Sequence, residues 1–336
     1  MPTSRRVAVL GAGSIGCFVG GMLARGGHDV RLLARPRVID SIRANGLRLS
    51  TVEGLDATVP AARLRLSDQP DILGDAEVIL VTVKSTDTAS AAALIARHGA
   101  GGATVISLQN GVGNAAVLVA GLPGRAVLAG MVAFNVQSMG EGRFHRATSG
   151  DIVIQRDAAG TARMLSVPDL ILRPSDNIAG VQWGKLILNL NNALNALSGL
   201  PVRAQLMQRP WRQLMADQWA EALNVVRAAN IRLVAATPVP ASVTPWLLRL
   251  PDPLFKAMLG RTMTIDATAR SSMSDDLLLG RPTEIDFLQG LIVETAQKHG
   301  MEAPLSRRIV ALIKQAEAAA KGLPNLTPAQ VRTGDA

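Results

Sequence analysis

The sequence has no tyrosine, one cysteine and few aromatic residues, and each scarcity excludes a class of protein. A single cysteine, Cys17, cannot form a disulfide within the chain, which is typical of a protein from the reducing cytoplasm. Aromatic residues make up 3% of the chain, so few rings are present to stack nucleic-acid bases. No apolar run reaches the roughly 18 residues of a membrane-spanning helix. Residues 1–6 also lead directly into a strand pattern, without the apolar segment of a signal peptide.

The net charge of +9 comes from scattered lysine and arginine residues and not from a basic run. A basic surface suits anionic small molecules as well as nucleic acids. Because no nucleic-acid motif accompanies the charge, we expect no nucleic-acid partner and no membrane partner. Hydrophobic residues make up 48% of the 336 residues and charged residues 18%, which indicates a folded chain long enough for two domains.

The first half alternates short β-rich runs with helical stretches, a pattern typical of a parallel, doubly wound sheet. Apolar runs that predict buried strands occur at 7–10, 29–33, 78–83 and 104–108. Residues 127–136 and 142–154 flank a Gly-Glu-Gly turn, and we expect them to form an antiparallel hairpin that closes the sheet.

The second half contains mainly helical patterns, at 183–197, 211–228, 283–299 and 305–321. The predicted fold is therefore α/β, with an N-terminal Rossmann-type doubly wound sheet at 1–177 and an all-helical C-terminal domain at 178–321. Residues 322–336 are polar and are expected to form a frayed tail. Helical faces could pair two chains into a homodimer, although no heptad seam is present.

A glycine-rich motif between the first strand and the first helix predicts a dinucleotide site. It consists of Gly11, Ala12, Gly13, Ser14, Ile15 and Gly16. The motif alone has low specificity, but here it follows a strand and opens a helix, as a Rossmann fingerprint must. The first glycine permits the turn, the second lets a pyrophosphate approach the backbone, and the third lets the helix pack on the strand. The helix N-terminus then offers N–H groups to the phosphates.

The end of the second predicted strand favours NADP(H) over NAD(H). An NAD enzyme usually has Asp or Glu at this point, which bonds the ribose 2′-hydroxyl. This chain has Arg35, with Arg37 as a weaker second candidate, and a guanidinium binds a 2′-phosphate through charge-assisted hydrogen bonds. The alternative is that both are ordinary surface arginines.

Polar side chains follow the next two predicted strands of the sheet. Lys84 follows the strand at 78–83, and Asn110 follows the strand at 104–108. Ligands of open α/β sheets bind beyond the carboxyl ends of the strands. Lys84 could therefore reach a phosphate, and Asn110 the nicotinamide ribose or the substrate. Either residue alone could equally be a solvated loop residue, but successive strand ends favour ligand contact.

Reduction of a ketone also needs an acid that protonates the forming alkoxide. Among the histidines, only His145, on the predicted hairpin, is hard to dismiss. A better candidate is Lys185, which shares a helical face with Asn189 and Asn192 at i+4 and i+7. Uncharged amides around one lysine indicate a polar pocket in which each amide orients a substrate oxygen. The alternative is a solvated helical turn.

A second polar segment contains Ser272 and, after a Gly-Arg-Pro turn, Glu284. Thr283 is expected to N-cap the following helix, with Asp286 as its partner in a capping box. Glu284 would then lie near a helix N-terminus, where a carboxylate is stabilised.

Taken in order along the chain, these features resemble those of the ketopantoate reductase (2-dehydropantoate 2-reductase) family. The last segment is the most specific, because it is not a general Rossmann feature. The features are the motif at 11–16, Arg35, Val83-Lys84, Gln109-Asn110-Gly111, Lys185 with Asn189, and Ser271-Ser272-Met273 followed by residues 281–286.

The resemblance implies a two-domain oxidoreductase that uses NADPH to reduce ketopantoate to pantoate, a step of pantothenate biosynthesis. It implies that the motif glycines, Arg35 and Lys84 contact the cofactor, and that Asn110 lies between cofactor and substrate.

The resemblance also implies roles for the polar residues of the second half. Lys185 would polarise the keto oxygen and deliver the proton. Glu284 would position the substrate hydroxyl and help to set the protonation state of Lys185. Asn189 and Ser272 would hold substrate oxygens.

Two positions depart from the family pattern, and both belong to the substrate pocket. Ala193 stands where a second asparagine is expected two helical turns beyond the lysine, with Asn192 one place early, and Arg203 stands near a further expected asparagine. Reduction of some 2-keto acid is therefore the broader expectation, and the added arginine would suit a more acidic substrate. The alternatives are a related hydroxy-acid or polyol-phosphate dehydrogenase, or a non-catalytic NADP(H)-binding regulator. No metal is expected.

Overall fold

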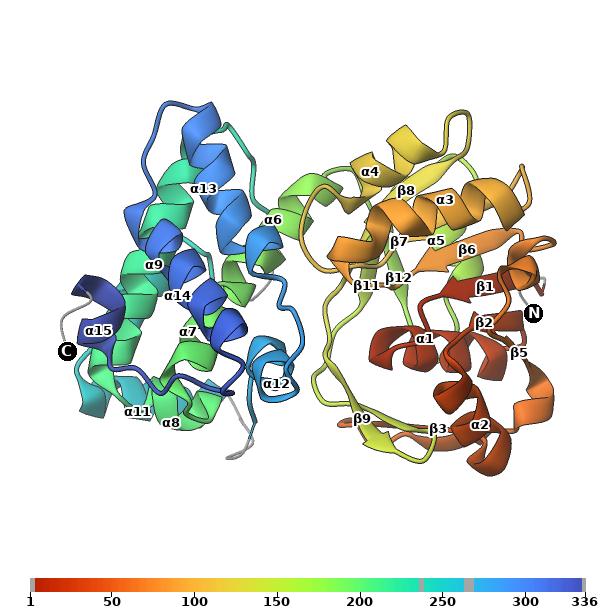
Figure 1. The fold of residues 1–336 in the computed structure, drawn as a ribbon, viewed down its shortest axis with the longest axis horizontal. Helices are drawn as coiled ribbons and strands as arrows, with labels where there is room; N and C mark the ends of the chain where they lie inside the picture. Colours follow the sequence, from red (N-terminus) through yellow and green to blue (C-terminus); the bar gives the residue numbers. More distant parts are fainter. Residues whose placement is uncertain (1–3, 236–238, 263–268, 334–336) are drawn as a thin grey trace. The chain divides into compact units, whose positions relative to one another are not determined.

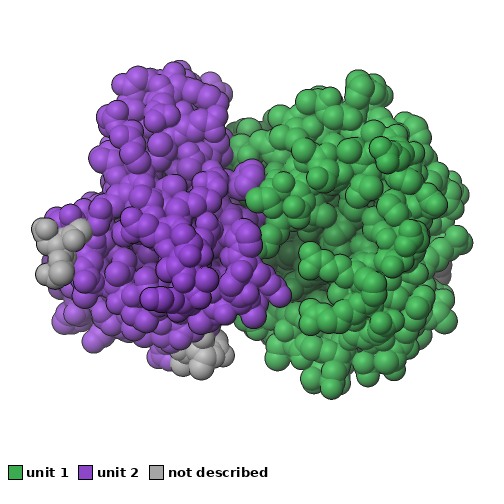
Figure 2. All heavy atoms as spheres, viewed as in Figure 1, with its two compact units in different colours: residues 1–182 green, residues 183–336 purple. Residues whose placement is uncertain are grey.

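The computed structural model describes residues 4–235, 239–262 and 269–333. The chain divides into two compact units, residues 1–182 and 183–336 (Figure 2). The boundary falls within helix α6 (Ile178–Asn189), whose first residue is the predicted start of the second domain. None of the helices in the described ranges has the length and apolar character needed to cross a membrane.

The first unit contains a large, mostly parallel sheet with the strand order β12-β11-β8-β7-β6-β1-β2-β5 (Figure 1). Its strands are β1 (Arg6–Leu10), β2 (Asp29–Leu33), β5 (Leu64–Ser67), β6 (Val78–Val81), β7 (Thr104–Ser107), β8 (Val127–Val132), β11 (Ile152–Gln155) and β12 (Leu172–Ser175). Only the β8–β11 pair is antiparallel. The Rossmann-type prediction is therefore confirmed.

A smaller sheet in the same unit has the order β4-β3-β10-β9. It consists of β3 (Leu47–Thr51), β4 (Asp56–Val59), β9 (Val136–Gly140) and β10 (Arg143–Arg146). The predicted hairpin at 127–154 is wrong in its extent, because each of its strands is divided between the two sheets. The turn itself is present between β9 and β10, where Gly140, Glu141 and Gly142 all have positive φ.

Helices cover both faces of the large sheet. They are α1 (Ser14–Arg25), α2 (Pro36–Asn45), α3 (Thr88–His98), α4 (Asn114–Gly121) and α5 (Thr161–Leu165), with short 3-10 turns η1 (Ala61–Arg63), η2 (Pro70–Leu73) and η3 (Ser85–Asp87). Helices α3 and α4 pack against each other, and their buried side chains join those of β6 and β7 in one core cluster.

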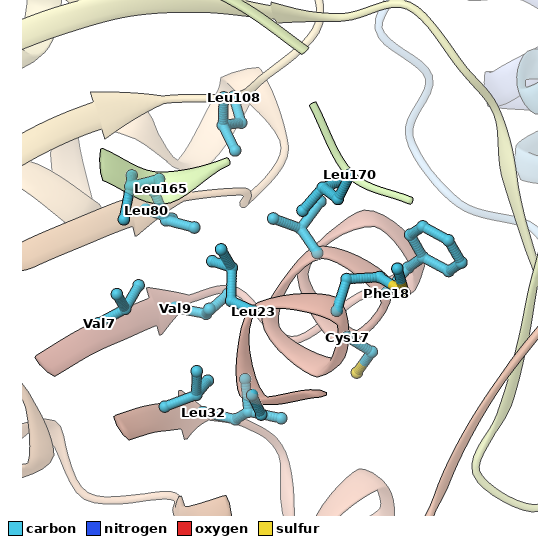
Figure 3. Close-up of a cluster of buried hydrophobic side chains, with 14 of the residues drawn as sticks. Val7, Val9, Cys17, Phe18, Leu23, Leu32, Leu80, Leu108, Leu165 and Leu170 are labelled. Carbon is cyan, nitrogen blue, oxygen red and sulfur yellow. The ribbon is translucent and has the colours of Figure 1, made fainter. Parts of the chain in front are cut away.

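Helix α1 packs between the two sheets, which explains why its residues are mostly small or apolar on every side of the helix. It contacts β1 and β2 of the large sheet as well as β3, β9 and β10 of the small one. A Cβ on Gly20 would stand 2.7 Å from Leu32, and one on Gly21 would stand 2.6 Å from Leu47, so larger residues would push the sheets apart. Leu23 lies in the core on the side of α1 that faces β1, whereas Phe18 lies on the other side of the helix (Figure 3), where its ring packs edge-on against Phe134. Cys17 is also buried there, and burial raises the pKa of its thiol to about 12, so it is chemically inert.

The second unit contains helices and connecting loops, and no strand, in its described residues (Figure 1). It contains the end of α6, then α7 (Asn191–Ser198), α8 (Val202–Leu206), α9 (Arg209–Ala228), α10 (Thr244–Leu248), α11 (Asp252–Thr262), α12 (Ser272–Leu278), η4 (Ile285–Phe287), α13 (Gln289–Lys298), α14 (Pro304–Ala319) and α15 (Pro328–Thr333). Helices α9, α13 and α14 pack against one another, and α7 packs on α12 and α14. The all-helical prediction for this part of the chain is confirmed.

Three local predictions in this unit are corrected by the structure. The helix expected at 183–197 is interrupted at Leu190, whose carbonyl accepts a hydrogen bond from the Gln289 side chain at 2.8 Å. The helix expected at 283–299 begins only at Gln289, after η4. Residues 328–333 of the predicted frayed tail form α15, because Val331 is buried and Arg308 donates hydrogen bonds to the carbonyls of Gln330 and Val331.

Candidate functional site

The glycine motif forms a tight turn between β1 and α1. Gly11 has φ +105°, and a Cβ there would stand 2.7 Å from the backbone nitrogen of Val83 on the neighbouring strand end. A Cβ on Gly16 would stand 2.3 Å from the Gly11 carbonyl oxygen and 2.6 Å from the Thr82 hydroxyl. Both glycines are therefore required by close packing within the protein itself.

Gly13 differs from the other two glycines of the motif, because no described residue other than its immediate chain neighbours has an atom within 4 Å of the place where its Cβ would stand. Its φ of −81° is one that any residue can adopt. Gly13 is also the N-cap of α1, where no side chain caps the helix and no acidic residue lies in the first turn. Open space beside the uncapped, positive end of a helix dipole is suited to a phosphate group.

Arg35 immediately follows Ala34 at the end of β2 and is the N-cap residue of α2. Its side chain and that of Arg37 are exposed. Within the described part of the chain, neither guanidinium takes part in a hydrogen bond or ion pair. Both cations are therefore available to an external anion.

Lys84 and Asn110 follow β6 and β7, which lie next to β1 and β2 in the sheet order. The four parallel strand ends thus place the glycine turn, Arg35, Lys84 and Asn110 along one edge of the sheet. Lys84 is half-buried, and Asn110 is exposed. The structure therefore brings together the residues that the sequence predicts for the nucleotide.

A buried hydrogen-bond network, which the sequence analysis missed, joins the loops that contain Lys84 and Asn110. The Asn110 carbonyl accepts hydrogen bonds from the Ser85 hydroxyl at 2.9 Å and from the Asn114 amide at 2.8 Å. Asn114 also accepts from the Thr88 hydroxyl at 2.9 Å, and Gln109 donates to Thr88 at 2.8 Å and to the Lys84 carbonyl at 3.4 Å. The network fixes one loop against the other.

Replacing Asn114 by Ala is expected to lower the free energy of unfolding by about 1–3 kcal/mol, because buried partners lose their hydrogen bonds. Urea unfolding at pH 7 measures the change. Asn45→Ala is the matched control, since Asn45 is also helical but makes one exposed bond, to the Ser41 carbonyl. Equal effects of the two substitutions would show that the network does not stabilise the loops.

In the second unit, Lys185 lies on α6 between residues that are fully buried. Leu186 and Ile187 are at most 1% exposed, and Lys185 itself is half-buried. Desolvation by burial lowers the pKa of Lys185 to about 8, so its ammonium is a much better proton donor than that of a solvated lysine.

Asn189 is the last residue of α6 and Asn192 lies near the start of α7, so both stay close to Lys185 along the chain. Both side chains are half-buried. The opposite stripe of leucines is buried as expected, with Leu190 and Leu194 at 0% exposure. The leucines are thus buried in the core of the unit, while Lys185, Asn189 and Asn192 each keep part of their surface exposed.

Two hydrogen bonds connect this helical stretch to the later polar segments. The Ser271 hydroxyl donates to the Asn192 carbonyl at 3.0 Å, and the Gln289 amide donates to the Leu190 carbonyl at 2.8 Å. Ser272 follows Ser271 directly, and Glu284 precedes Gln289 by five residues. These two bonds bring the start of α12 and the start of α13 to the junction of α6 and α7.

The serines at the start of α12 differ in their surroundings. Ser272 is exposed, whereas Ser271 is buried and accepts a hydrogen bond from the Ser274 backbone as the N-cap of the helix. Asn195, which the sequence analysis passed over, is fully buried and accepts from both Ser271 N–H and the Ser274 hydroxyl. Asn195 and Ser271 are therefore structural, and Ser272 remains the serine that can meet a ligand.

Glu284 is half-buried and precedes η4. The predicted capping box is wrong. The Thr283 hydroxyl donates to Glu317 at 2.6 Å, and the Asp286 carboxylate pairs with Lys314 at 2.6 Å. No side chain caps η4, so Glu284 is presented by a segment held on α14 and not by a regular helix N-terminus.

Three further residues named in the sequence analysis are His145, Ala193 and Arg203. His145 lies in β10 of the small sheet and bonds the Ser50 hydroxyl at 2.9 Å, away from the strand ends described above. Ala193 is fully buried, and Arg203 is exposed on α8. Among the described residues, no group of histidine, cysteine and acidic side chains could hold a metal ion.

Comparisons with known proteins match both halves of the chain to one family. Residues 7–158 match the family described as ketopantoate reductase PanE/ApbA, and residues 177–317 match its C-terminal counterpart. The 2-dehydropantoate 2-reductase of Halobacterium salinarum is 30% identical over an alignment of 321 residues that covers 93% of this chain and 99% of that protein.

Solved structures are similar over the same extent. The PanE/ApbA family ketopantoate reductase from Ralstonia eutropha JMP134 is 34% identical with a TM-score of 0.80, covering 94% of this chain and 99% of that one. A D-mandelate dehydrogenase solved with NADH and anilino(oxo)acetate has a TM-score of 0.77 at 21% identity, covering 94% and 99%, and shares the fold. With both family regions matched and near-complete relatives at 30% identity or more, the chain belongs to the ketopantoate reductase family.

Proposed function

We propose that the protein reduces 2-dehydropantoate (ketopantoate) to pantoate with NADPH, and thereby supplies pantothenate biosynthesis. The observation that carries the proposal is Lys185, a desolvated lysine with a pKa of about 8 in a chain of the ketopantoate reductase family. A sensor of NADP(H) would have no use for such a proton donor.

The first unit fits a nicotinamide dinucleotide. Gly13 leaves open space at the uncapped end of α1 for the pyrophosphate, and Arg35 lies at the end of β2, where a 2′-phosphate would be bound. Lys84 and Asn110 lie at the two neighbouring strand ends. When bound, the nicotinamide supplies the hydride that reduces the ketone.

The second unit supplies the proton and the substrate contacts in this proposal. The Lys185 ammonium hydrogen-bonds the keto oxygen, stabilises the negative charge that develops there, and transfers its proton to that oxygen. Asn189, Asn192 and Ser272 donate to substrate oxygens. Glu284 accepts a hydrogen bond from the substrate hydroxyl.

Replacing Gly13 by Ala is expected to affect cofactor binding, whereas replacing Gly16 by Ala is expected to affect stability. Gly13→Ala should leave the melting temperature unchanged and weaken NADPH binding about tenfold or more, because its methyl enters the space of the pyrophosphate. Gly16→Ala should lower the melting temperature of the protein without ligand, because its methyl meets the Gly11 carbonyl. Thermal unfolding and NADPH fluorescence titration measure both effects. Unchanged NADPH binding by Gly13→Ala would place the pyrophosphate elsewhere.

The direct test of the proposed function is oxidation of NADPH, followed at 340 nm, with ketopantoate, pyruvate or 2-ketoisovalerate as substrate and NADH as the control cofactor. We expect rapid turnover that is selective for NADPH and ketopantoate. NADPH binding without turnover of ketopantoate would contradict the proposed substrate. Turnover of another 2-keto acid would indicate that Ala193 and Arg203 change the substrate preference.

Light scattering on the same sample tests the predicted homodimer.

A further inference from the structure

The residue that directly precedes Glu284 is bound to helix α14 by one carboxylate, that of Glu317. Both the backbone N–H and the hydroxyl of Thr283 donate to the same oxygen of Glu317, at 2.8 and 2.6 Å. Thr283 is 4% exposed, so these bonds are shielded from water. Thr283 is separated from Glu317 by 34 residues in sequence and directly precedes Glu284.

The residues after Glu284 are held in the same way. The Ile285 N–H donates to the Thr283 hydroxyl at 3.3 Å, and the Ile285 side chain is fully buried. Lys314, one turn before Glu317 on α14, pairs with Asp286 at 2.6 Å and with Glu317 at 3.3 Å. The backbone of Glu284 is therefore fixed on both sides.

Glu317 is suited to this task because it stays ionised. Its burial raises the pKa of its carboxyl, but the hydrogen bonds from Thr283 and the charge of Lys314 outweigh that effect, and the pKa is lowered overall. An ionised carboxylate accepts stronger hydrogen bonds than a neutral group. Only 18% of the Glu317 side chain is exposed, and its partners belong to the Glu284 segment and to α14 itself.

We propose that Glu317 is a positioning residue for the reaction: through Thr283 it holds Glu284 in the place from which that carboxylate contacts the substrate hydroxyl. The inference rests on the proposed function for its effect on turnover, but its structural part can be tested without a substrate. Misplacement of a reacting group by about 1 Å can reduce turnover by about 100-fold, so a distant anchor can control the rate.

The chain offers a matched control in Glu221 on α9. Its two carboxylate oxygens accept the N–H groups of Leu305 and Ser306, at 2.9 and 2.8 Å, at the start of the same helix α14. Glu221→Ala and Glu317→Ala should therefore destabilise the protein to a similar degree. Only Glu317→Ala should lower kcat, by roughly 10- to 100-fold, with little change in the NADPH dissociation constant.

Amide hydrogen exchange at residues 282–288 tests the anchor in the protein without substrate. Glu317→Ala is expected to accelerate exchange in this segment, whereas Glu221→Ala is expected to leave it unchanged. Exchange that is equal in the two variants would overturn the proposal, whatever the activity of the wild type. If the wild type does not reduce ketopantoate, the proposed function fails, and the exchange result still decides the role of Glu317.

Conservative substitutions at position 317 distinguish the effect of side-chain length on kcat from the effect of side-chain charge. Glu317→Gln keeps an acceptor oxygen at the same reach and should retain most of kcat, whereas Glu317→Asp shortens the anchor and should lose about tenfold. In the Glu284→Gln background, Glu317→Ala should have no further effect on kcat, because both changes then act on the same group. Additive losses, or a better rate for Asp than for Gln, would contradict positioning through Glu284.

Discussion

Replacing Lys185 by Met is expected to lower kcat about 1,000-fold while the dissociation constant of NADPH stays nearly the same. The magnitude is that of removing a general acid, which contributes typically 10²- to 10⁴-fold. Methionine has a similar length and suits the apolar neighbours Leu186 and Ile187. Single-turnover kinetics at 340 nm and a fluorescence titration with NADPH measure the two quantities. Turnover within tenfold of the wild type would remove Lys185 from the mechanism.

The same lysine should set the high-pH limb of the activity profile. As a proton donor, Lys185 must be protonated. Above the pKa of Lys185 in the free enzyme, which is about 8, kcat/KM is therefore expected to fall tenfold per pH unit. In Lys185→Met, the remaining activity should not show this limb. A profile that stays flat to pH 10 would contradict a proton transfer from Lys185.

Stability should change with pH in the opposite direction. Because burial lowers the pKa of Lys185 from 10.5 to about 8, the folded state loses the proton before the unfolded state does. The unfolded state therefore binds more protons between about pH 8 and 10.5, and this lysine makes the protein more stable as pH rises through that window. Lys185→Met should accordingly be more stable than the wild type at pH 7, and the difference should shrink by pH 10. Urea unfolding at both pH values measures the difference in stability between the two proteins. Lys298→Met is the control: Lys298 is exposed, so its replacement should not produce this pH-dependent difference.

The positions of the residues proposed to bind the nucleotide could be predicted from the sequence because they follow from the local order of strands and turns. Each parallel strand is a short apolar run, and the residue after it reaches the same edge of the sheet. Arg35, Lys84 and Asn110 are therefore placed by counting along the chain, and the sheet order puts their strands beside one another. The Lys185 face of α6 was predictable for the same reason, since helical spacing is local.

The supporting residues could not be predicted because their partners are distant in sequence. Asn195 bonds Ser271, Thr283 bonds Glu317, and Gln289 bonds the Leu190 carbonyl, across 76, 34 and 99 residues. The expected capping box at Thr283 failed for this reason, because a local partner is outweighed by a buried, ionised one. No periodicity marks such contacts, and only the packed helices reveal them.

Replacing Arg35 by Asp is expected to reverse the cofactor preference from NADPH to NADH. In the proposed NADPH site, the change removes a charge-assisted hydrogen bond to the 2′-phosphate, worth about 1.5–3 kcal/mol, and puts a repelling carboxylate in its place. The ratio of kcat/KM for NADPH over NADH should therefore fall by about 100-fold or more. The new carboxylate would also bond the 2′-hydroxyl of NADH, so activity with NADH should rise and not merely persist.

Arg37→Asp is the matched control for this reversal, because it makes the same change in charge two residues further along, within α2. Long-range electrostatics alone would make the two variants similar, since both side chains are exposed and screened alike. Direct contact with the 2′-phosphate predicts a large effect at Arg35 and a several-fold effect at most at Arg37. A preference that followed Arg37 instead would move the 2′-phosphate onto the first turn of α2, and an unchanged preference in both variants would separate cofactor selection from the end of β2.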